Sequence, residues 1–188
     1  MSFYSVAPFI EKYYPQYYSI ETYPVSECAP FCRGREEWGI FSNFAHTPIQ
    51  YEDITYKSSE QLFQMMKFTD EEVRNAVYAA NNPKFTAKHY EKTHRRDDWE
   101  MIIVDAMKQC LQLKYEQNEE FRVALERSKG KYIVEDQSTF RKKTADTWGV
   151  KRQGDFYVGP NLMGRLLMEL RDNGRLEYNP PSHSVLHS

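Results

Sequence analysis

The strongest periodic signal in the chain is a long amphipathic segment that follows residue 98. Its apolar residues recur every three or four positions, the spacing that places them on one face of a helix. They are Trp99, Ile102, Ile103, Ala106, Cys110 and Leu113. Asp97 or Asp98 is predicted to cap this helix at its N-terminus. The segment makes a helix-rich domain the first expectation for the fold.

Shorter segments on both sides of it carry their own start and stop signals. Ser58 is a predicted N-cap for a helix over residues 59–68, with Gln61 completing a capping box. Thr69 and Glu72 form a second box, and this helix ends before Asn81-Asn82-Pro83. Further helices are predicted over residues 84–93, 119–130 and 161–174, the last two closed by Gly130 and Gly174.

Strand signals are few. "PIQYEDITYKSS" alternates around Glu52-Asp53 and predicts a hairpin, and "KYIVE" predicts one short strand. Residues 136–158 are interpreted as a polar stretch that runs through "DTWG". The sum is a helix-dominated α+β domain with a few short strands, too few for a parallel doubly wound sheet. We expect a Tyr-rich N-terminal extension over residues 1–30, one domain over 31–178 and a disordered tail over 179–188.

Composition limits the function classes. A net charge of −2 argues against a protein that depends on nonspecific phosphate contacts along its whole surface. Three cysteines form no disulfide framework and predict free thiols in a reducing compartment, with the cytoplasm as the default. No apolar run reaches the length of a membrane span. The five histidines lack ligand spacing, and neither a P-loop nor a Gly-rich dinucleotide motif occurs. We therefore expect no metal and no cofactor.

The stretch "SSEQLFQMMKF" presents the main question about function. On a helix, Glu60, Gln64 and Lys67 share one face, and the apolar residues between them face the core. Periodicity alone favours a solvated stripe on a surface helix. The alternative is a wall of a ligand site. In either case the helix N-terminus is expected to hold Glu60 ionised, which does not suit a general acid.

Three other segments are candidates for binding. Trp99 is either a core anchor or an aromatic platform for a base, with Arg95 and Arg96 placed to meet phosphate. "DTWG" contains Asp146, Trp148 and Gly149 in a segment with few apolar residues, which is more typical of a site than of a core. "GPNLMG" leads into a helix whose N-terminal amides could hold an anion.

Taken together, these segments resemble the NADAR (YbiA-like) family. The matching blocks occur in order over roughly residues 38–172. They are "WGIFSNFAHTPI", "ITYKSSEQLFQMMKF", "RRDDWEMIIVDAMKQCLQLKYEQN", "YIVE", "DTWG" and "GPNLMGRLLMELR". The family cleaves N-glycosidic bonds. Some members hydrolyse ribosylamino intermediates of riboflavin synthesis, and others remove ADP-ribose from guanine and so act as antitoxins against ADP-ribosyltransferase toxins.

The resemblance implies roles for particular residues. It implies catalytic roles for Glu60, Lys67, Glu135 and Asp146. The residues it implies for substrate binding are Asn43, Phe44, Gln64, Arg95, Arg96, Trp99, Trp148, Gly149, Asn161 and Gly164. With the family in view, the Glu60–Gln64–Lys67 face is better interpreted as a site wall than as a solvated stripe.

The expected reaction is cleavage of a C1′–N bond, in which a carboxylate stabilises the oxocarbenium-like transition state. Lys67 could attack the sugar as a Schiff-base amine or act as a cation for phosphate or sugar hydroxyls. Three functions remain open: removal of ADP-ribose from guanine, hydrolysis of a riboflavin intermediate, and non-catalytic ADP-ribose binding. Arg33, Arg35, the Tyr-rich extension and "VKRQ" favour ADP-ribose. The partners implied are ADP-ribose or ADP-ribosyl-guanine, ADP-ribosylated nucleic acid and a cognate toxin encoded nearby, with no membrane.

Overall fold

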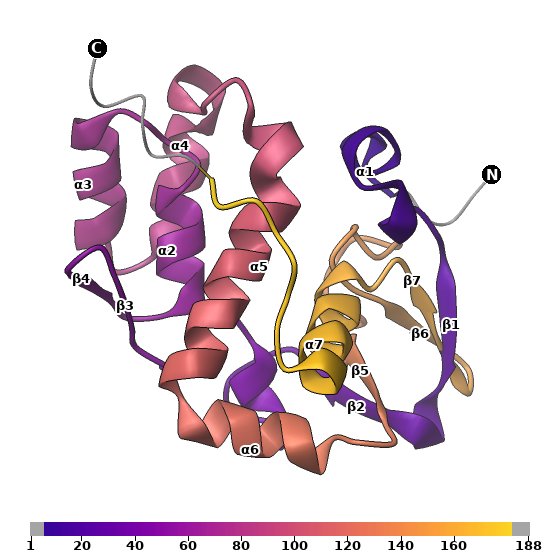
Figure 1. Cartoon of the computed structure of the whole chain (residues 1–188). Coiled ribbons are helices and arrows are strands. Elements are labelled where there is room, and N and C mark those ends of the chain that lie inside the picture. The colour runs from indigo at the N-terminus through magenta and orange to yellow at the C-terminus, as the bar shows by residue number, and fades with distance from the viewer. Residues whose placement is uncertain (1–5, 182–188) are drawn as a thin grey trace. The chain divides into compact units, whose positions relative to one another are not determined.

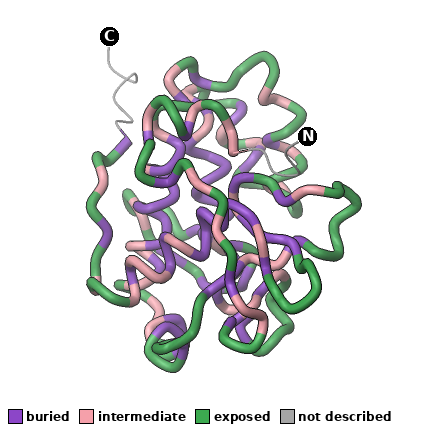
Figure 2. The backbone as a smooth tube through the Cα atoms, turned by 90° about the vertical axis from the view of Figure 1, so that its right-hand side faces the viewer, coloured by how far each residue is buried: buried purple, intermediate pink, exposed green. Residues whose placement is uncertain are grey.

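The computed structural model describes residues 6–181, and the chain divides into two compact units (Figure 1). We call residues 46–118 together with 177–181 the helical unit, and residues 6–45 together with 119–176 the sheet unit. Each unit is built from separate stretches of the chain. Exposed positions follow the loops, whereas buried positions gather on the helices and strands (Figure 2).

The helical unit opens with a β-hairpin and continues as four helices. Strands β3 (Ile49–Tyr51) and β4 (Ile54–Tyr56) pair antiparallel, and the turn residues Glu52 and Asp53 both have positive φ, as a type I′ hairpin turn requires. The helices are α2 (Ser59–Met65), α3 (Glu71–Ala79), α4 (Pro83–His94) and α5 (Trp99–Gln117). The predicted hairpin and long helix are thus confirmed.

Local capping explains most of the helix boundaries in this unit. The Ser58 hydroxyl accepts the Gln61 amide at 3.3 Å, as predicted, and the Gln61 side chain accepts the amide of Lys57 at 2.7 Å. The prediction that Thr69 caps the second helix is wrong. Asp70 takes the cap position and accepts the Val73 amide at 3.0 Å, because a carboxylate at that position bonds the third helical amide directly.

The sheet unit combines short strands with two longer helices and the N-terminal segment. Its strands are β1 (Glu21–Pro24), β2 (Cys28–Phe31), β5 (Tyr132–Glu135), β6 (Lys151–Gln153) and β7 (Phe156–Gly159). Its helices are α1 (Pro8–Tyr13), α6 (Glu119–Arg127) and α7 (Leu162–Asn173), with short 3₁₀ turns at Pro15–Tyr17, Val25–Glu27 and Gly39–Phe41.

Two sheets organise this unit. One is antiparallel with the order β1-β7-β6, and the other is the parallel pair β2-β5. The polar stretch over residues 136–158, to which no strand was assigned from the sequence, contains β6 and the start of β7. The alternation of that hairpin is hidden by charged residues on its exposed face, whereas its inward residue Tyr157 joins the core with Tyr23 and Val134.

The fold class is the predicted helix-dominated α+β class. The N-terminal segment is part of the sheet unit, since β1 pairs along its whole length with β7 and Tyr14, Tyr17 and Tyr23 are buried. The three cysteines are free, as predicted. No helix within residues 6–181 has both the length and the apolarity to cross a membrane. The predicted tail lies mostly outside the described residues.

Candidate active site

In the helical unit, α2 carries the candidate residues Glu60 and Gln64 in a fully buried position. Glu60 is 6% exposed and Gln64 3% exposed, so the solvated-stripe interpretation does not apply to this face. The Gln64 amide nitrogen donates to Glu60 Oε1 at 2.7 Å. The Gln64 side-chain oxygen is buried and finds no hydrogen-bond partner among the described residues. An unsatisfied buried acceptor of this kind is typical of a site that receives a donor from water or a ligand.

Burial changes the expected charge state of Glu60. Desolvation raises the pKa of its carboxyl group, while Lys84, the Gln64 hydrogen bond and Lys67 act in the opposite direction. Burial thus acts against the helix N-terminus, which was expected to hold Glu60 ionised. The dipole of a seven-residue helix contributes less than the cost of removing a carboxylate from water. A raised pKa increases the fraction of a carboxyl group that is protonated at a given pH, and this direction favours a general acid.

Lys67 lies just beyond the end of α2, with its side chain 13% exposed. Its ammonium is 3.8 Å from Glu91 Oε1 on α4, and about 6 Å from the ring centres of Phe63 and Trp99 (6.0 and 5.9 Å). Burial lowers the pKa of Lys67, while Glu91 and Glu60 oppose the shift. The lowered pKa increases the fraction of neutral amine, which is the form that attacks a sugar carbon.

Trp99 is buried at 2% exposure, and its ring packs against Phe63 with 5.3 Å between centres. This placement favours the core-anchor alternative over a platform for a stacked base. Trp99 instead forms an aromatic wall beside Lys67, whose ammonium lies 5.9 Å from its ring centre, a cation–π contact that favours the charged form of the amine. Trp99, the first residue of α5, thus places the start of the longest helix next to the candidate residue Lys67.

The two arginines before α5 are engaged within the helical unit. Arg96 is 8% exposed and forms two hydrogen bonds with Asp98, at 2.5 and 2.9 Å, so Asp98 serves this pair and makes no side-chain cap bond to α5. The Arg96 amide donates to the Lys67 carbonyl at 2.9 Å and fixes the backbone behind the lysine. Arg95 is more exposed and lies 3.6 Å from Glu100. Both residues line a cavity of about 510 Å³ with Lys88, Glu91, Lys92 and Asp97.

The sheet unit holds the other two candidate carboxylates, and a residue that sequence reasoning missed joins them. The Gln137 amide nitrogen donates to Glu135 Oε2 at 3.0 Å and to Asp146 Oδ1 at 2.6 Å. The Gln137 oxygen accepts the Asp146 backbone amide at 2.9 Å. Asp146 Oδ1 also accepts the Trp148 amide at 2.9 Å. No local pattern marks Gln137, because it follows Glu135-Asp136 in an apparently ordinary polar run.

The turn before α7 has a structural role that differs from the predicted anion site. Asn161 has φ +51°, is wholly buried and spans to β5, donating to the Ile133 carbonyl at 2.9 Å and accepting the Glu135 amide at 3.2 Å. The amides of residues 161, 162 and 163 donate to the carbonyls of residues 149, 147 and 148. The hypothesis that these amides hold an anion is thus wrong, because backbone carbonyls already occupy them.

The two candidate glycines allow backbones to approach closely. A Cβ on Gly164 would lie 2.1 Å from the Ile133 carbonyl, and one on Gly149 would lie 2.6 Å from the Glu135 carbonyl. Of the remaining candidates in this unit, Asn43 is buried, Phe44 is 56% exposed and Trp148 is half-buried. The glycines position the Glu135 and Asp146 carboxylates through backbone packing.

A separate cavity of about 530 Å³ lies within the sheet unit. Its charged lining residues are the cations Arg33 and Lys131 and the carboxylates Glu36, Glu37 and Asp136, and the aromatic residues Phe31 and Trp38 also line it. This volume is within the roughly 300–1,000 Å³ range of pockets that hold drug-sized molecules. Within residues 6–181, no group of three or more His, Cys, Asp or Glu residues is placed to hold a metal ion.

Comparison with known proteins supports the sequence resemblance. The NADAR domain model matches residues 30–175. The N-glycosidase YbiA of Shigella flexneri is 33% identical over 144 residues, covering 76% of this chain and 85% of that protein. An N-glycosidase of Nostoc punctiforme is 26% identical over 145 residues, covering 74% and 88%. The NMR structure of Escherichia coli YbiA has a TM-score of 0.62 at 31% identity, covering 77% of this chain and 83% of that one.

A helix-dominated α+β chain with buried acidic and amine side chains thus has N-glycosidases as its relatives in sequence and structure. The chain belongs to the NADAR domain family. It is accordingly an enzyme of the N-glycosyl hydrolase class. The predicted domain boundaries, 31–178, remain a prediction beside the family match over residues 30–175.

Proposed function

We propose that this enzyme hydrolyses the C1′–N bond of ADP-ribosylated guanine and so reverses ADP-ribosylation. The observation that carries the proposal is the buried cluster of Glu60, Gln64 and Lys67. It combines a carboxyl group of raised pKa with an amine of lowered pKa in one unit. Glycosidic cleavage needs a proton for the departing base and a nucleophile for C1′, and these two groups match those needs.

In the proposed first step, the neutral Lys67 amine attacks C1′ while the C1′–N bond breaks. The bonding electron pair leaves with the guanine nitrogen, which takes a proton from the Glu60 carboxyl group. The new ammonium then passes a proton to O4′ as the C1′–O4′ bond opens, which gives a protonated Schiff base and a free C4′ hydroxyl. Both Glu60 and Lys67 are supported in their roles by burial, because a low dielectric disfavours their charged forms.

In the second step, water adds to C1′ of the Schiff base, and Glu60 as a carboxylate takes the proton. Collapse of the resulting carbinolamine releases the Lys67 amine and the sugar aldehyde, which closes to ADP-ribose. The net reaction consumes one water. Glu135 and Asp146 are proposed as further catalytic carboxylates, and their shared amide donor Gln137, which is substituted below, holds them in a defined orientation.

The choice of substrate depends on the cavity of the sheet unit. The cations Arg33 and Lys131 in its lining are suited to phosphate, although three carboxylates line it as well, and its volume exceeds what a ribose 5-phosphate fills. Two of the sequence features that favour ADP-ribose, the Tyr-rich extension and "VKRQ", give this choice of substrate no support in the structure. Tyr14, Tyr17 and Tyr23 are buried, and the Lys151 side chain of "VKRQ" donates to the Phe140 carbonyl. Arg33 remains as support, since it lines the cavity.

The test is a direct comparison of substrates. The protein is incubated with an ADP-ribosylated guanine oligonucleotide, with ADP-ribosylated guanosine and with a ribosylamino pyrimidine 5′-phosphate, and released sugar is measured by mass spectrometry. We expect ADP-ribose release with kcat/KM at least tenfold above that for the pyrimidine substrate. Preference for the pyrimidine would establish the riboflavin-type activity instead. Binding of ADP-ribose without hydrolysis of any substrate would contradict the proposed reaction.

A further inference from the structure

Residues 137–146 of the sheet unit form a loop that is closed at its neck. Gln137 and Asp146 stand at the two ends and are joined by two hydrogen bonds, one from the Gln137 amide nitrogen at 2.6 Å and one to the Gln137 oxygen at 2.9 Å. The same Gln137 nitrogen contacts Glu135 at 3.0 Å. The neck of the loop is therefore built from the candidate carboxylates of this unit.

Further bonds fix the lower part of the loop to the β6–β7 hairpin. The Lys151 ammonium donates to the Phe140 carbonyl at 2.9 Å, and the Arg152 amide donates to the Ser138 hydroxyl at 2.8 Å. The Phe140 amide donates to the Gln137 carbonyl at 3.0 Å. These contacts hold the backbone in place up to residue 140, so the side chains beyond it are presented from a defined base.

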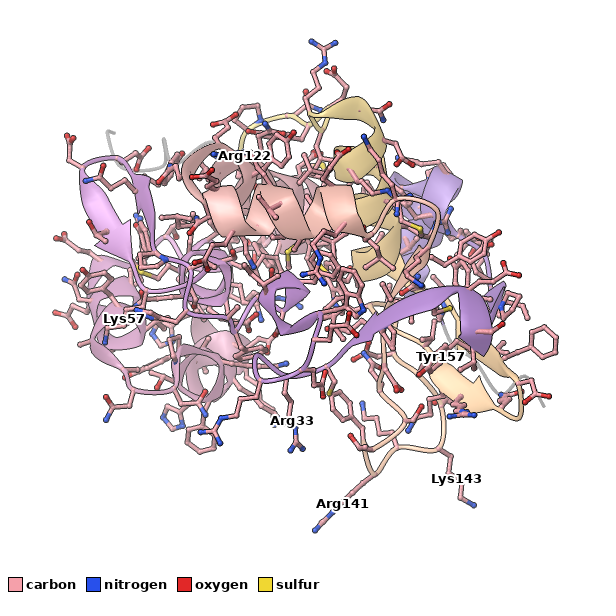
Figure 3. The ribbon with its side chains drawn as sticks, turned by 90° about the horizontal axis from the view of Figure 1, so that it is seen from below. Arg33, Lys57, Arg122, Arg141, Lys143 and Tyr157 are labelled. Carbon is pink, nitrogen blue, oxygen red and sulfur yellow. The ribbon has the colours of Figure 1, made fainter. Side chains whose placement is uncertain are left out.

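The tip of the loop carries Phe140, Arg141, Lys142 and Lys143, all exposed. Figure 3 shows Arg141 and Lys143 at the outer end of the loop, pointing away from the ribbon. None of the three cations forms an ion pair with any residue in the part of the chain that the structure describes. A run of cations alone is usually a solvated surface. Here it accompanies Phe140, a large apolar residue that is 46% exposed.

The combination of an exposed ring and adjacent cations matches one class of ligand. Single-stranded nucleic acid presents unstacked bases to aromatic side chains and phosphates to Arg and Lys. The chain as a whole carries a charge of −2, so contact with phosphate requires a local cationic surface such as this one. Thr139, next to Phe140, lines the cavity of the sheet unit together with Arg33. The tip therefore begins at the residue that follows Thr139 of the cavity lining.

We propose that the tip formed by residues 140–143 binds a single-stranded nucleic acid next to its modified guanine, with a base on Phe140 and phosphates on Arg141, Lys142 and Lys143. This inference rests on the proposed function, and it specifies a polynucleotide as the substrate in place of a free nucleotide. The tip supplies affinity for the strand that flanks the guanine. It has no part in the cleavage of the small substrate.

The experiment compares four proteins. They are the wild type, Phe140→Ala, the triple variant Arg141→Ala/Lys142→Ala/Lys143→Ala, and a matched triple variant Lys12→Ala/Lys57→Ala/Lys129→Ala, which removes the same charge from exposed positions elsewhere. Binding of a fluorescent, unmodified single-stranded oligonucleotide is measured by anisotropy from 50 to 200 mM salt. Steady-state hydrolysis is measured for the ADP-ribosylated oligonucleotide and for ADP-ribosylated guanosine.

We expect the tip variant to bind the oligonucleotide about tenfold more weakly at low salt, and its log–log salt slope to fall in magnitude by about 2, since each phosphate contact contributes roughly 0.7. Phe140→Ala should weaken binding by about tenfold or less, with an unchanged slope, because stacking is uncharged. The KM for the oligonucleotide should rise in both variants, while hydrolysis of ADP-ribosylated guanosine and the binding by the control triple should stay at wild-type values.

Equal losses in the tip and control triples would overturn the proposal, as would tighter binding of duplex than of single strands. Its failure is separable from failure of the proposed function. If the wild type cleaves neither ADP-ribosylated substrate, the proposed function fails, while the anisotropy result still decides the binding surface. If both substrates are cleaved and the tip variant matches the wild type in oligonucleotide KM and binding, the binding surface alone is wrong.

Discussion

Gln64 donates its amide to Glu60 at 2.7 Å, one turn away on α2, and both side chains are buried. The bond gives Glu60 one polar partner where water is excluded, and burial still raises the pKa of its carboxyl group. The helix pattern alone would place Glu60 on a solvated face. In the structure it is buried, and the direction of its pKa shift favours proton transfer. This relationship is the basis of the first prediction.

Glu60→Gln should lower kcat by roughly a hundredfold or more, because an amide can neither donate nor accept the transferred proton. The fold should persist, since Gln has nearly the same shape and avoids burying a charge. Turnover and the melting temperature are measured together. Glu72→Gln, on the exposed first turn of α3, is the matched control and should keep wild-type turnover. A fully active Glu60→Gln variant would exclude Glu60 from catalysis.

Lys114 predicts a pH dependence of stability that is independent of catalysis. It is wholly buried on α5, and burial lowers its pKa to about 7. Below pH 7 both the folded and the unfolded protein carry the ammonium, so the folded state has the full cost of burying it. As the pH rises from 7 toward the unfolded value of about 10.4, the folded state loses its proton first and stability increases.

The measurement is urea denaturation of the wild type and Lys114→Met between pH 6 and 9. Methionine fills similar space without a charge, so the variant should be more stable than the wild type by a few kcal/mol at pH 6. The difference should shrink as the pH rises to 9. Lys57→Met, at an exposed position, should show no such trend. A constant difference across the pH range would contradict the burial argument.

Gln137 is predicted to hold the carboxylates of the sheet unit together. Gln137→Ala removes the donor that Glu135 and Asp146 share, and should cost about 1–3 kcal/mol of unfolding free energy. It should also reduce turnover if these carboxylates act in the reaction. Thermal unfolding and kcat are compared with Gln153→Ala, an exposed position on β6. Identical behaviour of the two variants would show that the bridge has no energetic role.

Gly164 is predicted to be required by packing. Gly164→Ala places a Cβ 2.1 Å from the Ile133 carbonyl and should destabilise the protein by about 1–3 kcal/mol or more. Gly34→Ala is the control, since its Cβ would meet only an ordinary contact at 3.8 Å. Equilibrium unfolding measures both. A neutral Gly164→Ala would show that α7 can shift away from β5 without cost.

Sequence patterns predicted the elements whose signals are local. The α5 helix, the β3–β4 hairpin and the Ser58 cap depend on residues within a few positions of one another, and all three are present. The β6–β7 hairpin was missed because its exposed face carries charges and its partner β1 is more than a hundred residues away in the sequence. Pairing between strands that are so far apart in the sequence produces no recognisable pattern within a short stretch of residues.

The candidate site also combines features that follow from local sequence spacing with features that depend on long-range packing. The shared face of Glu60, Gln64 and Lys67 followed from helix spacing, but its burial depends on α4 and α5, which spacing does not reveal. The connection of Glu135 to Asp146 through Gln137 likewise depends on how a strand end meets a distant turn. The direction of the pKa shift of Glu60 could not be predicted, because the dipole argument is local, whereas desolvation reflects everything that packs around the carboxyl group.

Covalent trapping at Lys67 tests the proposed reaction most directly. The wild type and Lys67→Arg are incubated with ADP-ribosylated guanosine in the presence of borohydride, which reduces a Schiff base to a stable amine, and peptides are analysed by mass spectrometry. The account predicts an ADP-ribosyl adduct on Lys67 in the wild type and loss of turnover in Lys67→Arg, which keeps the charge without the nucleophilic amine. Absence of an adduct, together with an active Lys67→Arg variant, would contradict it.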